Sequence, residues 1–181
     1  MAQRDEVVVL VDERDRELGV MEKLRAHREG VLHRAVSVII LDSAGRLVLQ
    51  QRSAGKYHGA GLWSNTACGH PRPDESPRGT AQRRLREEMG LTCALRHAGT
   101  VVYRAKVGDL IEHELDHVFV GETVDDPRAD PAEVMAWRAI PLDELQRDIR
   151  DHPERYTPWL PVVLDAARRE TSPGPPSLTA E

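Results

Sequence analysis

Residues 68–91 combine cations and carboxylates at a spacing that could hold a phosphate group. Arg83 and Arg84 are followed within about one helical turn by Glu87 and Glu88. Carboxylates on one face of a helix can bind a divalent cation against a diphosphate, and guanidinium groups match phosphate oxygens in geometry. The simpler alternative is a surface helix in which Arg84 and Glu88 form an ion pair four residues apart.

Two further pairs of residues could take part in proton transfer or metal binding. Cys68 lies between two small residues, which is typical of a buried thiol, and its spacing from His70 would also suit a thiolate and imidazole pair on zinc. Glu112 and Glu114 are two positions apart. On a strand both carboxylates face the same side, as two ligands of one ion must.

A helix over residues 77–89 would position the charged segment. Ser76 followed by Pro77 is a typical N-cap and first-turn pair, and Gly90 lies where a terminating glycine belongs. Apolar residues recur every four positions and predict a buried stripe of Ala81, Leu85 and Met89.

Apolar and β-branched runs predict the strands behind this helix. Residues 35–42 and 46–52 indicate a hairpin, and the other predicted strands are 6–11, 99–107, 114–124 and 133–140. Two more helices are predicted over 142–151 and 158–170. Strands and helices without regular alternation indicate an α+β domain or an α/β/α sandwich on a mixed sheet. We expect one domain over residues 1–170 and a disordered tail over 171–181.

The composition excludes several classes of protein. The chain has 181 residues and a formal net charge of -5, so we expect one domain and no nucleic-acid partner. Its two cysteines form no disulfide framework, and no apolar run reaches the roughly 20 residues of a membrane span. The first residues lack the features of a signal peptide. A cytoplasmic protein with reduced thiols and no membrane partner is therefore expected.

The charged segment resembles the Nudix box, G-x5-E-x7-R-E-U-x-E-E-x-G-U, where U is an aliphatic residue. Eight of the nine defined positions match, and the exception is Arg84, where the box has glutamate. In Nudix hydrolases that glutamate belongs to the metal cluster that activates water. The resemblance therefore implies that Arg84 disables ordinary pyrophosphate hydrolysis and grips phosphate instead.

Segments around the box are similar to the type 1 isopentenyl diphosphate isomerase family, whose box has the same change to arginine. They are residues 22–27, 32–35, 64–71, 112–114 and 158–160, and the likeness extends from Val8 to Trp159. The resemblance implies a Nudix-type fold and an isomerase of isoprenoid precursor biosynthesis, which interconverts isopentenyl and dimethylallyl diphosphate through a tertiary carbocation. A Nudix pyrophosphohydrolase and a non-catalytic Nudix-fold binding module are the alternatives.

The resemblance also implies two cation sites. One divalent metal, Mn2+ or Zn2+, would be bound by His27, His33, His70, Glu112 and Glu114. Imidazole and carboxylate ligands without thiolate suit such a cation. Glu88 would hold a Mg2+ ion that bridges the protein and the substrate diphosphate. His113 and His117 remain open as further ligands, whereas His58, His97 and His152 receive no role.

The implied mechanism needs two opposed proton-transfer groups, one for each side of the carbocation. The resemblance gives these roles to Cys68 and to Glu114 with Tyr103, and their order stays open. The basic residues expected on the diphosphate are Lys23, Arg52, Lys56 and Arg84. A carbocation needs a dry pocket with an aromatic face, which stabilises a cation without attacking it. The resemblance implies that Trp159, rather than Trp63, covers this pocket. We expect a monomer acting on a small prenyl diphosphate.

Overall fold

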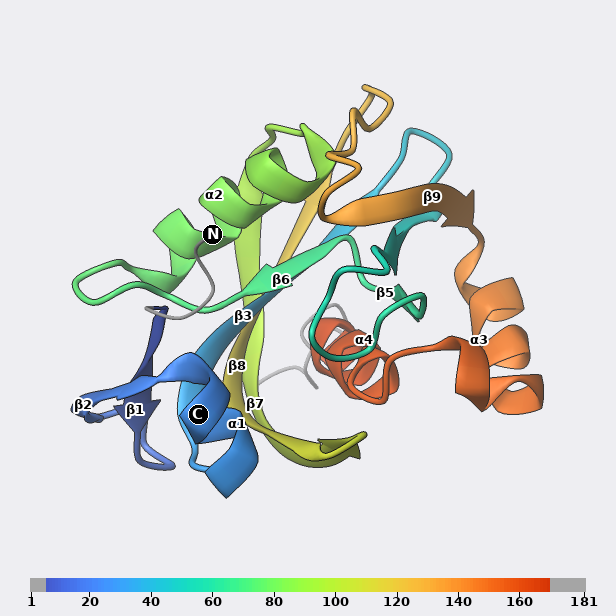
Figure 1. The fold of residues 1–181 in the computed structure, drawn as a ribbon. Helices are drawn as coiled ribbons and strands as arrows, with labels where there is room; N and C mark the ends of the chain where they lie inside the picture. Colours follow the sequence, from blue (N-terminus) through green and yellow to red (C-terminus); the bar gives the residue numbers. More distant parts are fainter. Residues whose placement is uncertain (1–5, 170–181) are drawn as a thin grey trace, which may run out of the picture.

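A computed structural model of the chain describes residues 6–169 (Figure 1). The first five residues of the predicted domain and the predicted tail, residues 171–181, lie outside this range. A nine-stranded mixed sheet with flanking helices agrees with the predicted α+β class. Its strands are β1 (Val7–Val11), β2 (Glu17–Glu22), β3 (His33–Leu41), β4 (Leu47–Arg52), β5 (Trp63–Ser64), β6 (Ala67–Gly69), β7 (Leu95–Val107), β8 (Leu110–Glu122) and β9 (Val134–Ile140). The helices are α1 (Lys23–Glu29), α2 (Pro77–Met89), α3 (Leu142–Asp151), the 3-10 turn η1 (Pro153–Arg155) and α4 (Leu160–Arg169).

Strand β3 organises the sheet. It runs antiparallel to β1, β4 and β6, and parallel to β8. The parallel register places His33 opposite Glu114, and the antiparallel register places Ser37 opposite Cys68. The chain between β3 and β8 includes the crossover that a parallel pair requires. This one strand therefore brings together residues from β6 and β8 that are distant in the sequence.

The two faces of β3 pack into separate cores. Val38 belongs to a buried cluster with Leu85 of α2, whereas Ile39 belongs to a cluster with Val163 of α4. This alternation follows from the two-residue period of a strand. In Figure 1, α2 and α4 lie on opposite sides of β3 and β8, which gives the predicted layers of helix, sheet and helix.

Helix α2 begins and ends as the sequence predicts. The Ser76 hydroxyl oxygen accepts a hydrogen bond from the Gly79 backbone N–H at 3.1 Å. Gly90 has a φ of 64°, in the left-handed region, and its N–H donates to the Arg86 carbonyl at 3.0 Å. The predicted stripe of Ala81, Leu85 and Met89 is at most 1% exposed.

The predicted hairpin of residues 35–42 and 46–52 is confirmed, but five short elements were not predicted: β2, α1, β5, β6 and η1. Strands β7 and β8 also begin four residues earlier than predicted, at Leu95 and Leu110. Helix α1 spans seven residues, which is too short for a clear apolar period. It depends instead on its caps, the Glu22 carboxylate at one end and the left-handed Gly30 at the other. No helix within residues 6–169 is long and apolar enough to cross a membrane.

Candidate active site

A pocket of about 230 Å³ opens beside β6 and β8 and is bordered by α2 and the loop between β4 and β5. The predicted catalytic and substrate-binding residues all line it: Cys68, Tyr103, Glu114, Lys23, Arg52, Lys56, Arg84 and Trp159. Glu88, His70 and Glu112 of the predicted cation sites also line it. The structure therefore brings together residues from six elements and three loops.

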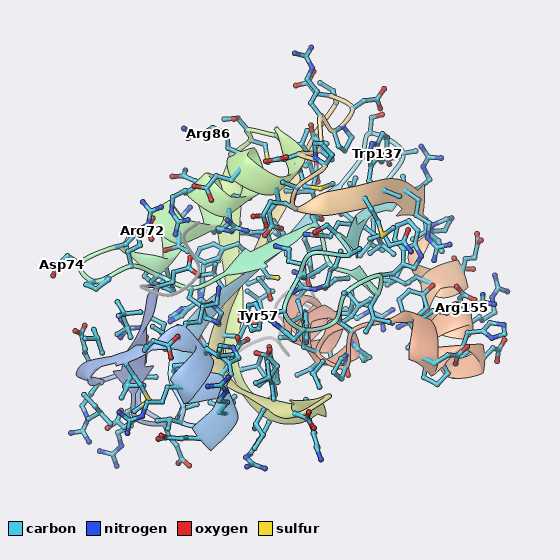
Figure 2. The ribbon with its side chains drawn as sticks, in the orientation of Figure 1. Tyr57, Arg72, Asp74, Arg86, Trp137 and Arg155 are labelled. Atoms are coloured by element: carbon cyan, nitrogen blue, oxygen red, sulfur yellow. The ribbon has the colours of Figure 1, made fainter. Side chains whose placement is uncertain are left out.

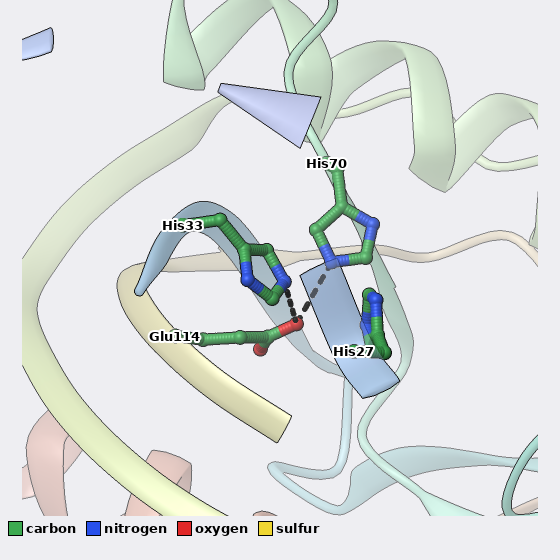
Figure 3. A group of neighbouring side chains, drawn as sticks. All are labelled: His27, His33, His70 and Glu114. Carbon is green, nitrogen blue, oxygen red and sulfur yellow. Dashed lines mark hydrogen bonds and ion pairs between the residues drawn. The ribbon is translucent and has the colours of Figure 1, made fainter. Parts of the chain in front are cut away.

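Four of the five residues predicted for the first metal form a compact group (Figure 3). One ligand atom from each of His27, His33, His70 and Glu114 lies within 4.8 Å of the others. Glu114 Oε1 is 2.8 Å from His70 Nε2 and 3.6 Å from His33 Nε2. His33 Nε2 is buried without a hydrogen-bond partner among residues 6–169, as expected for an atom that binds a metal.

Backbone contacts orient two of these imidazoles. Nδ1 of His27 lies 2.7 Å from the Lys23 carbonyl, and Nδ1 of His33 lies 2.8 Å from the Val31 carbonyl. A carbonyl oxygen only accepts, so each Nδ1 carries the proton. The lone pair is then on Nε2, and Nε2 points into the group of four.

The protonation states of His70 and Glu114 also suit a cation. Burial alone would lower the pKa of His27, but its contact with Glu112 outweighs burial and raises it. Burial lowers the pKa of His70 to about 4, so its imidazole is neutral at neutral pH. Burial raises the pKa of Glu114, but the neighbouring His33 and His70 imidazoles outweigh it and hold that pKa well below its usual range. Neutral imidazole and ionised carboxylate are the forms that bind Mn2+ or Zn2+, so the residues present fit such an ion.

Glu112 lies beside the group of four and is not part of it. Its Oε2 is 3.3 Å from His27 Nε2, and its Oε1 is 2.6 Å from His58 Nε2. Glu112 and Glu114 share one buried face of β8, at 1% and 7% exposure, as their spacing predicts. The carboxylate is therefore next to a predicted ligand and also bound to a residue that the sequence left without a role.

The two histidines that the sequence left open lie on the other face of β8, because they alternate with the two glutamates. His113 Nδ1 is 2.9 Å from the Gly30 carbonyl, and His117 Nε2 is 2.9 Å from Asp15 Oδ2. Neither belongs to the group of four.

The proton-transfer candidates lie on different strands of the pocket. Arg52 Nη1 donates to Cys68 Sγ at 3.7 Å. Burial and the nearby charge of Glu88 raise the pKa of Cys68 to about 12, so it is a neutral thiol at neutral pH. Tyr103 lies opposite Glu114 in the β7–β8 pair and donates its hydroxyl proton to Glu114 Oε2. The pocket thus contains a thiol and a separate carboxylate that is bound to a phenol.

Carboxylates accompany three of the four predicted phosphate-binding cations. Lys23 Nζ is 2.7 Å from Glu6, while Lys56 and Arg84 both contact Glu133 Oε2. These contacts keep several positive charges together in a confined space.

Arg84 and Glu88 form the i,i+4 ion pair of the simpler sequence alternative, although Glu88 is buried at 1% exposure and not on the surface. The other Glu88 oxygen accepts from the Gln50 side chain. A magnesium role for Glu88 therefore requires Arg84 to exchange this partner for phosphate.

The two candidate tryptophans differ in position. Trp159 is 3% exposed, lines the pocket, and has the Arg52 guanidinium 5.4 Å from its ring centroid. Trp63 is not among the described residues that line the pocket, and the Arg138 guanidinium stacks 4.6 Å from its ring. The structure therefore favours Trp159 as the aromatic wall, as the sequence does.

Sequence reasoning missed four titratable residues that line the pocket: Glu6, Tyr57, His58 and Glu133. Glu6 and Glu133 are the first residues of the segments predicted as strands 6–11 and 133–140. Tyr57 and His58 directly follow Lys56, which was the only sequence signal available for them. Their positions depend on how a loop folds back, and no local pattern predicts that.

The chain matches the NUDIX domain family over residues 31–160. It is 51% identical over 162 residues to isopentenyl-diphosphate Delta-isomerase 2 of Aromatoleum aromaticum, covering 89% of this chain and 86% of the relative. It is 50% identical over 164 residues to isopentenyl-diphosphate Delta-isomerase of Burkholderia multivorans, covering 90% and 93%. A crystal structure from Deinococcus radiodurans superposes with a TM-score of 0.75 at 19% identity, over 92% of this chain and 100% of that one, which shows the fold alone. With half of its residues identical to theirs over nearly its whole length, the chain belongs to the isopentenyl-diphosphate Delta-isomerase family and has the NUDIX fold.

Proposed function

We infer that this protein is an isopentenyl-diphosphate Delta-isomerase, an enzyme that moves a double bond within a prenyl diphosphate and cleaves no phosphate. The observation that supports this most is the pocket itself, where a thiol and a phenol-bound carboxylate lie with four cations. Two separate proton-transfer groups suit a reaction in which one proton is added and another is removed. Arg84 in place of the box glutamate argues against a hydrolase.

The proposed substrate site uses the four cations for the diphosphate. Lys23, Lys56 and Arg84 would exchange their carboxylate partners for phosphate oxygens, and Arg52 would contribute from above Trp159. Charge-assisted hydrogen bonds to phosphate are stronger than neutral ones, which favours the exchange. A Mg2+ ion held by Glu88 would neutralise part of the remaining negative charge.

The proposed chemistry has two proton transfers. One group donates a proton to the terminal alkene carbon, the adjacent carbon becomes a tertiary carbocation, and the second group removes a proton from the carbon on its other side. The double bond moves by one position and the proton count is unchanged. Cys68 as a thiol can donate, Glu114 as a carboxylate can accept, and the Tyr103 hydroxyl keeps Glu114 oriented.

The pocket must exclude water, because water would quench the carbocation. Trp159 supplies a buried aromatic face for this purpose. A Mn2+ or Zn2+ ion bound by His27, His33, His70 and Glu114 would supply positive charge and fix the Glu114 carboxylate in place. We also propose that the enzyme acts as a monomer in the cytoplasm.

The test is to incubate purified protein with isopentenyl diphosphate and Mg2+ and to measure the acid-labile allylic product. We expect Cys68→Ala and Glu114→Gln each to lower kcat by about 10²–10⁴-fold, the usual worth of a general acid or base. Cys93→Ala is the matched control, because Cys93 is outside the residues that line this pocket.

Three other outcomes would overturn the proposal or part of it. Phosphate release would indicate a hydrolase, and no turnover would indicate a binding module. Full activity in both variants would remove Cys68 and Glu114 from the mechanism. The position of solvent deuterium in the product of each variant would establish the order of the two proton transfers.

A further inference from the structure

His58 is a buried imidazole that the proposed function does not use. It lies in the loop between β4 and β5, and its side chain is 8% exposed. Its Nε2 is 2.6 Å from Glu112 Oε1, within ion-pair distance, while its Nδ1 and Glu112 Oε1 are both buried without a hydrogen-bond partner among residues 6–169. The orientation of this ring therefore depends on Glu112.

Glu112 connects His58 to the metal group, which is the group of four formed by His27, His33, His70 and Glu114. Its second oxygen, Oε2, is 3.3 Å from Nε2 of His27, the atom that would bind the ion. A histidine that contacts one carboxylate oxygen leaves the other oxygen available to a cation. With His58 on Oε1, Glu112 would present Oε2 to an ion bound at His27.

A second side chain of the same loop reaches the metal group. The Tyr57 hydroxyl lies 3.5 Å from His27 Nε2, and Lys23 Nζ lies 5.1 Å from the centroid of the Tyr57 ring. In the view of Figure 2, Tyr57 lies near the middle, whereas Arg72 and Asp74 stand on the outer turn before α2. This loop is thus anchored inward, toward the metal group, at two consecutive residues.

The same loop also contains or contacts two of the cations proposed to bind the diphosphate. Lys56 belongs to it, and the His58 carbonyl accepts a hydrogen bond from Arg52 Nη2 at 3.1 Å. Gly59 has a φ of 58°, and a Cβ there would lie 3.3 Å from Arg52 Nε and 3.6 Å from Trp159. The backbone at residues 58 and 59 therefore packs directly against Arg52 and Trp159, so the position of the loop determines the position of both side chains.

We propose that His58 is a positioning residue that couples the two cation sites: it orients Glu112 toward the ion at His27, His33, His70 and Glu114, and that ion in turn holds the loop that positions Lys56 and Arg52. The coupling rests on the proposed metal site. In this role His58 makes no contact with the reacting carbons.

The variants His58→Leu and His58→Gln test the coupling in the full chain. Leucine removes the donor, while the glutamine amide N–H can replace it. Metal-stripped protein would be titrated with Zn2+ against a chelator, without substrate. We expect His58→Leu to bind Zn2+ about 10–100-fold more weakly, the usual effect of losing a partner behind a metal ligand, and His58→Gln to recover most of this loss.

Hydrogen exchange gives the second measurement. The loop amides of Lys56, Gly61 and Leu62 form hydrogen bonds within residues 52–62 and should report its order. We expect Zn2+ to slow their exchange in the wild type and in His58→Gln, but not in His58→Leu at the same metal occupancy. His152→Leu, at an exposed histidine after α3, is the control and should behave as the wild type.

Two results would overturn the proposal: unchanged Zn2+ affinity in His58→Leu, or the same slowing of loop exchange by Zn2+ in that variant. A wild-type protein that binds no Zn2+ would overturn it as well. Unchanged exchange in α2 would show that His58→Leu is folded. Because no measurement uses a prenyl substrate, an inactive enzyme that retains the coupling would contradict the proposed function and leave the inference standing.

Discussion

At the scale of single residues, Glu133 is a carboxylate that pairs with two cations of the proposed diphosphate site. Its Oε2 contacts both Lys56 Nζ and Arg84 Nη2, the latter at 3.0 Å, so it occupies donors that a diphosphate would need. We expect Glu133→Gln to bind inorganic pyrophosphate about two- to five-fold more tightly, as a partly exposed ion pair is worth at most about 1 kcal/mol. Calorimetric titration would measure this.

Glu144→Gln, an exposed residue of α3, is the matched control for the change in net charge. Weaker binding of pyrophosphate by Glu133→Gln in the presence of Mg2+ would contradict the competition. It would instead make Glu133 a helper of Glu88 on the magnesium ion.

Residues of the site differ in how far the sequence could predict them. Arg84 and Cys68 were found because they lie in or beside a segment with fixed spacing. Glu112 and Glu114 share a face because a strand alternates. The contact of Glu112 with His58 joins residues 54 positions apart through an irregular loop, and no periodic pattern encodes such a contact.

At the scale of elements, β6 packs against α2 at Gly69, where the Arg84 side chain lies close to the backbone. A Cβ at this position would lie 2.8 Å from Arg84 Cγ, so a side chain must push Arg84 away from the pocket. We expect Gly69→Ala to weaken pyrophosphate binding about tenfold or more, because losing a charge-assisted hydrogen bond costs about 1.5–3 kcal/mol. Gly55→Ala is the control, since its Cβ would meet Ser53 Oγ only at 3.9 Å.

Unchanged pyrophosphate affinity in a folded Gly69→Ala protein would mean that Arg84 is not a phosphate ligand. A thermal unfolding curve for each variant separates this result from a loss of structure.

An ion pair joins the turn before α2 to the helix. The stability of the folded state should therefore depend on pH. Arg83 Nε is 2.7 Å from Glu75 Oε1, and this hydrogen bond is the main reason that the pKa of Glu75 falls from 4.5 to about 2. The folded state binds this proton less readily than the unfolded state. The stabilisation is therefore complete above the unfolded pKa and is lost as pH falls toward the folded one.

We expect Glu75→Gln to lower Tm by about 2–4 °C at neutral pH, which corresponds to roughly 1 kcal/mol for a chain of this size. The difference from the wild type should narrow as pH falls from about 5 to about 3. Calorimetry at several pH values would measure it. A difference that stays constant with pH would show that the ion pair does not stabilise the fold.

Elements also differ in how well a sequence predicts them. Both caps and the apolar stripe of α2 lie within 15 residues, so the whole helix could be predicted. Strand β6 has three residues and exists because Cys68 pairs with Ser37 of β3, which is 31 positions earlier. Its strand conformation comes from that long-range pairing, which no propensity of its own sequence encodes.

At the scale of the whole molecule, the metal group gathers residues from four separate segments of the chain. His27 is in α1, His33 begins β3, His70 follows β6, and Glu114 is in β8. An ion that binds only the folded state stabilises it by mass action, by about 2.7 kcal/mol when its concentration is a hundred times its dissociation constant. We therefore expect a chelator to lower Tm by roughly 5–10 °C, and Zn2+ or Mn2+ to restore it.

In His70→Ala the response of Tm to added metal should largely disappear, whereas in His113→Ala, whose imidazole lies on the other face of β8, it should remain. An equal response in both variants would mean that the ion binds elsewhere. A response lost only in His113→Ala would move the metal to the opposite face of the sheet.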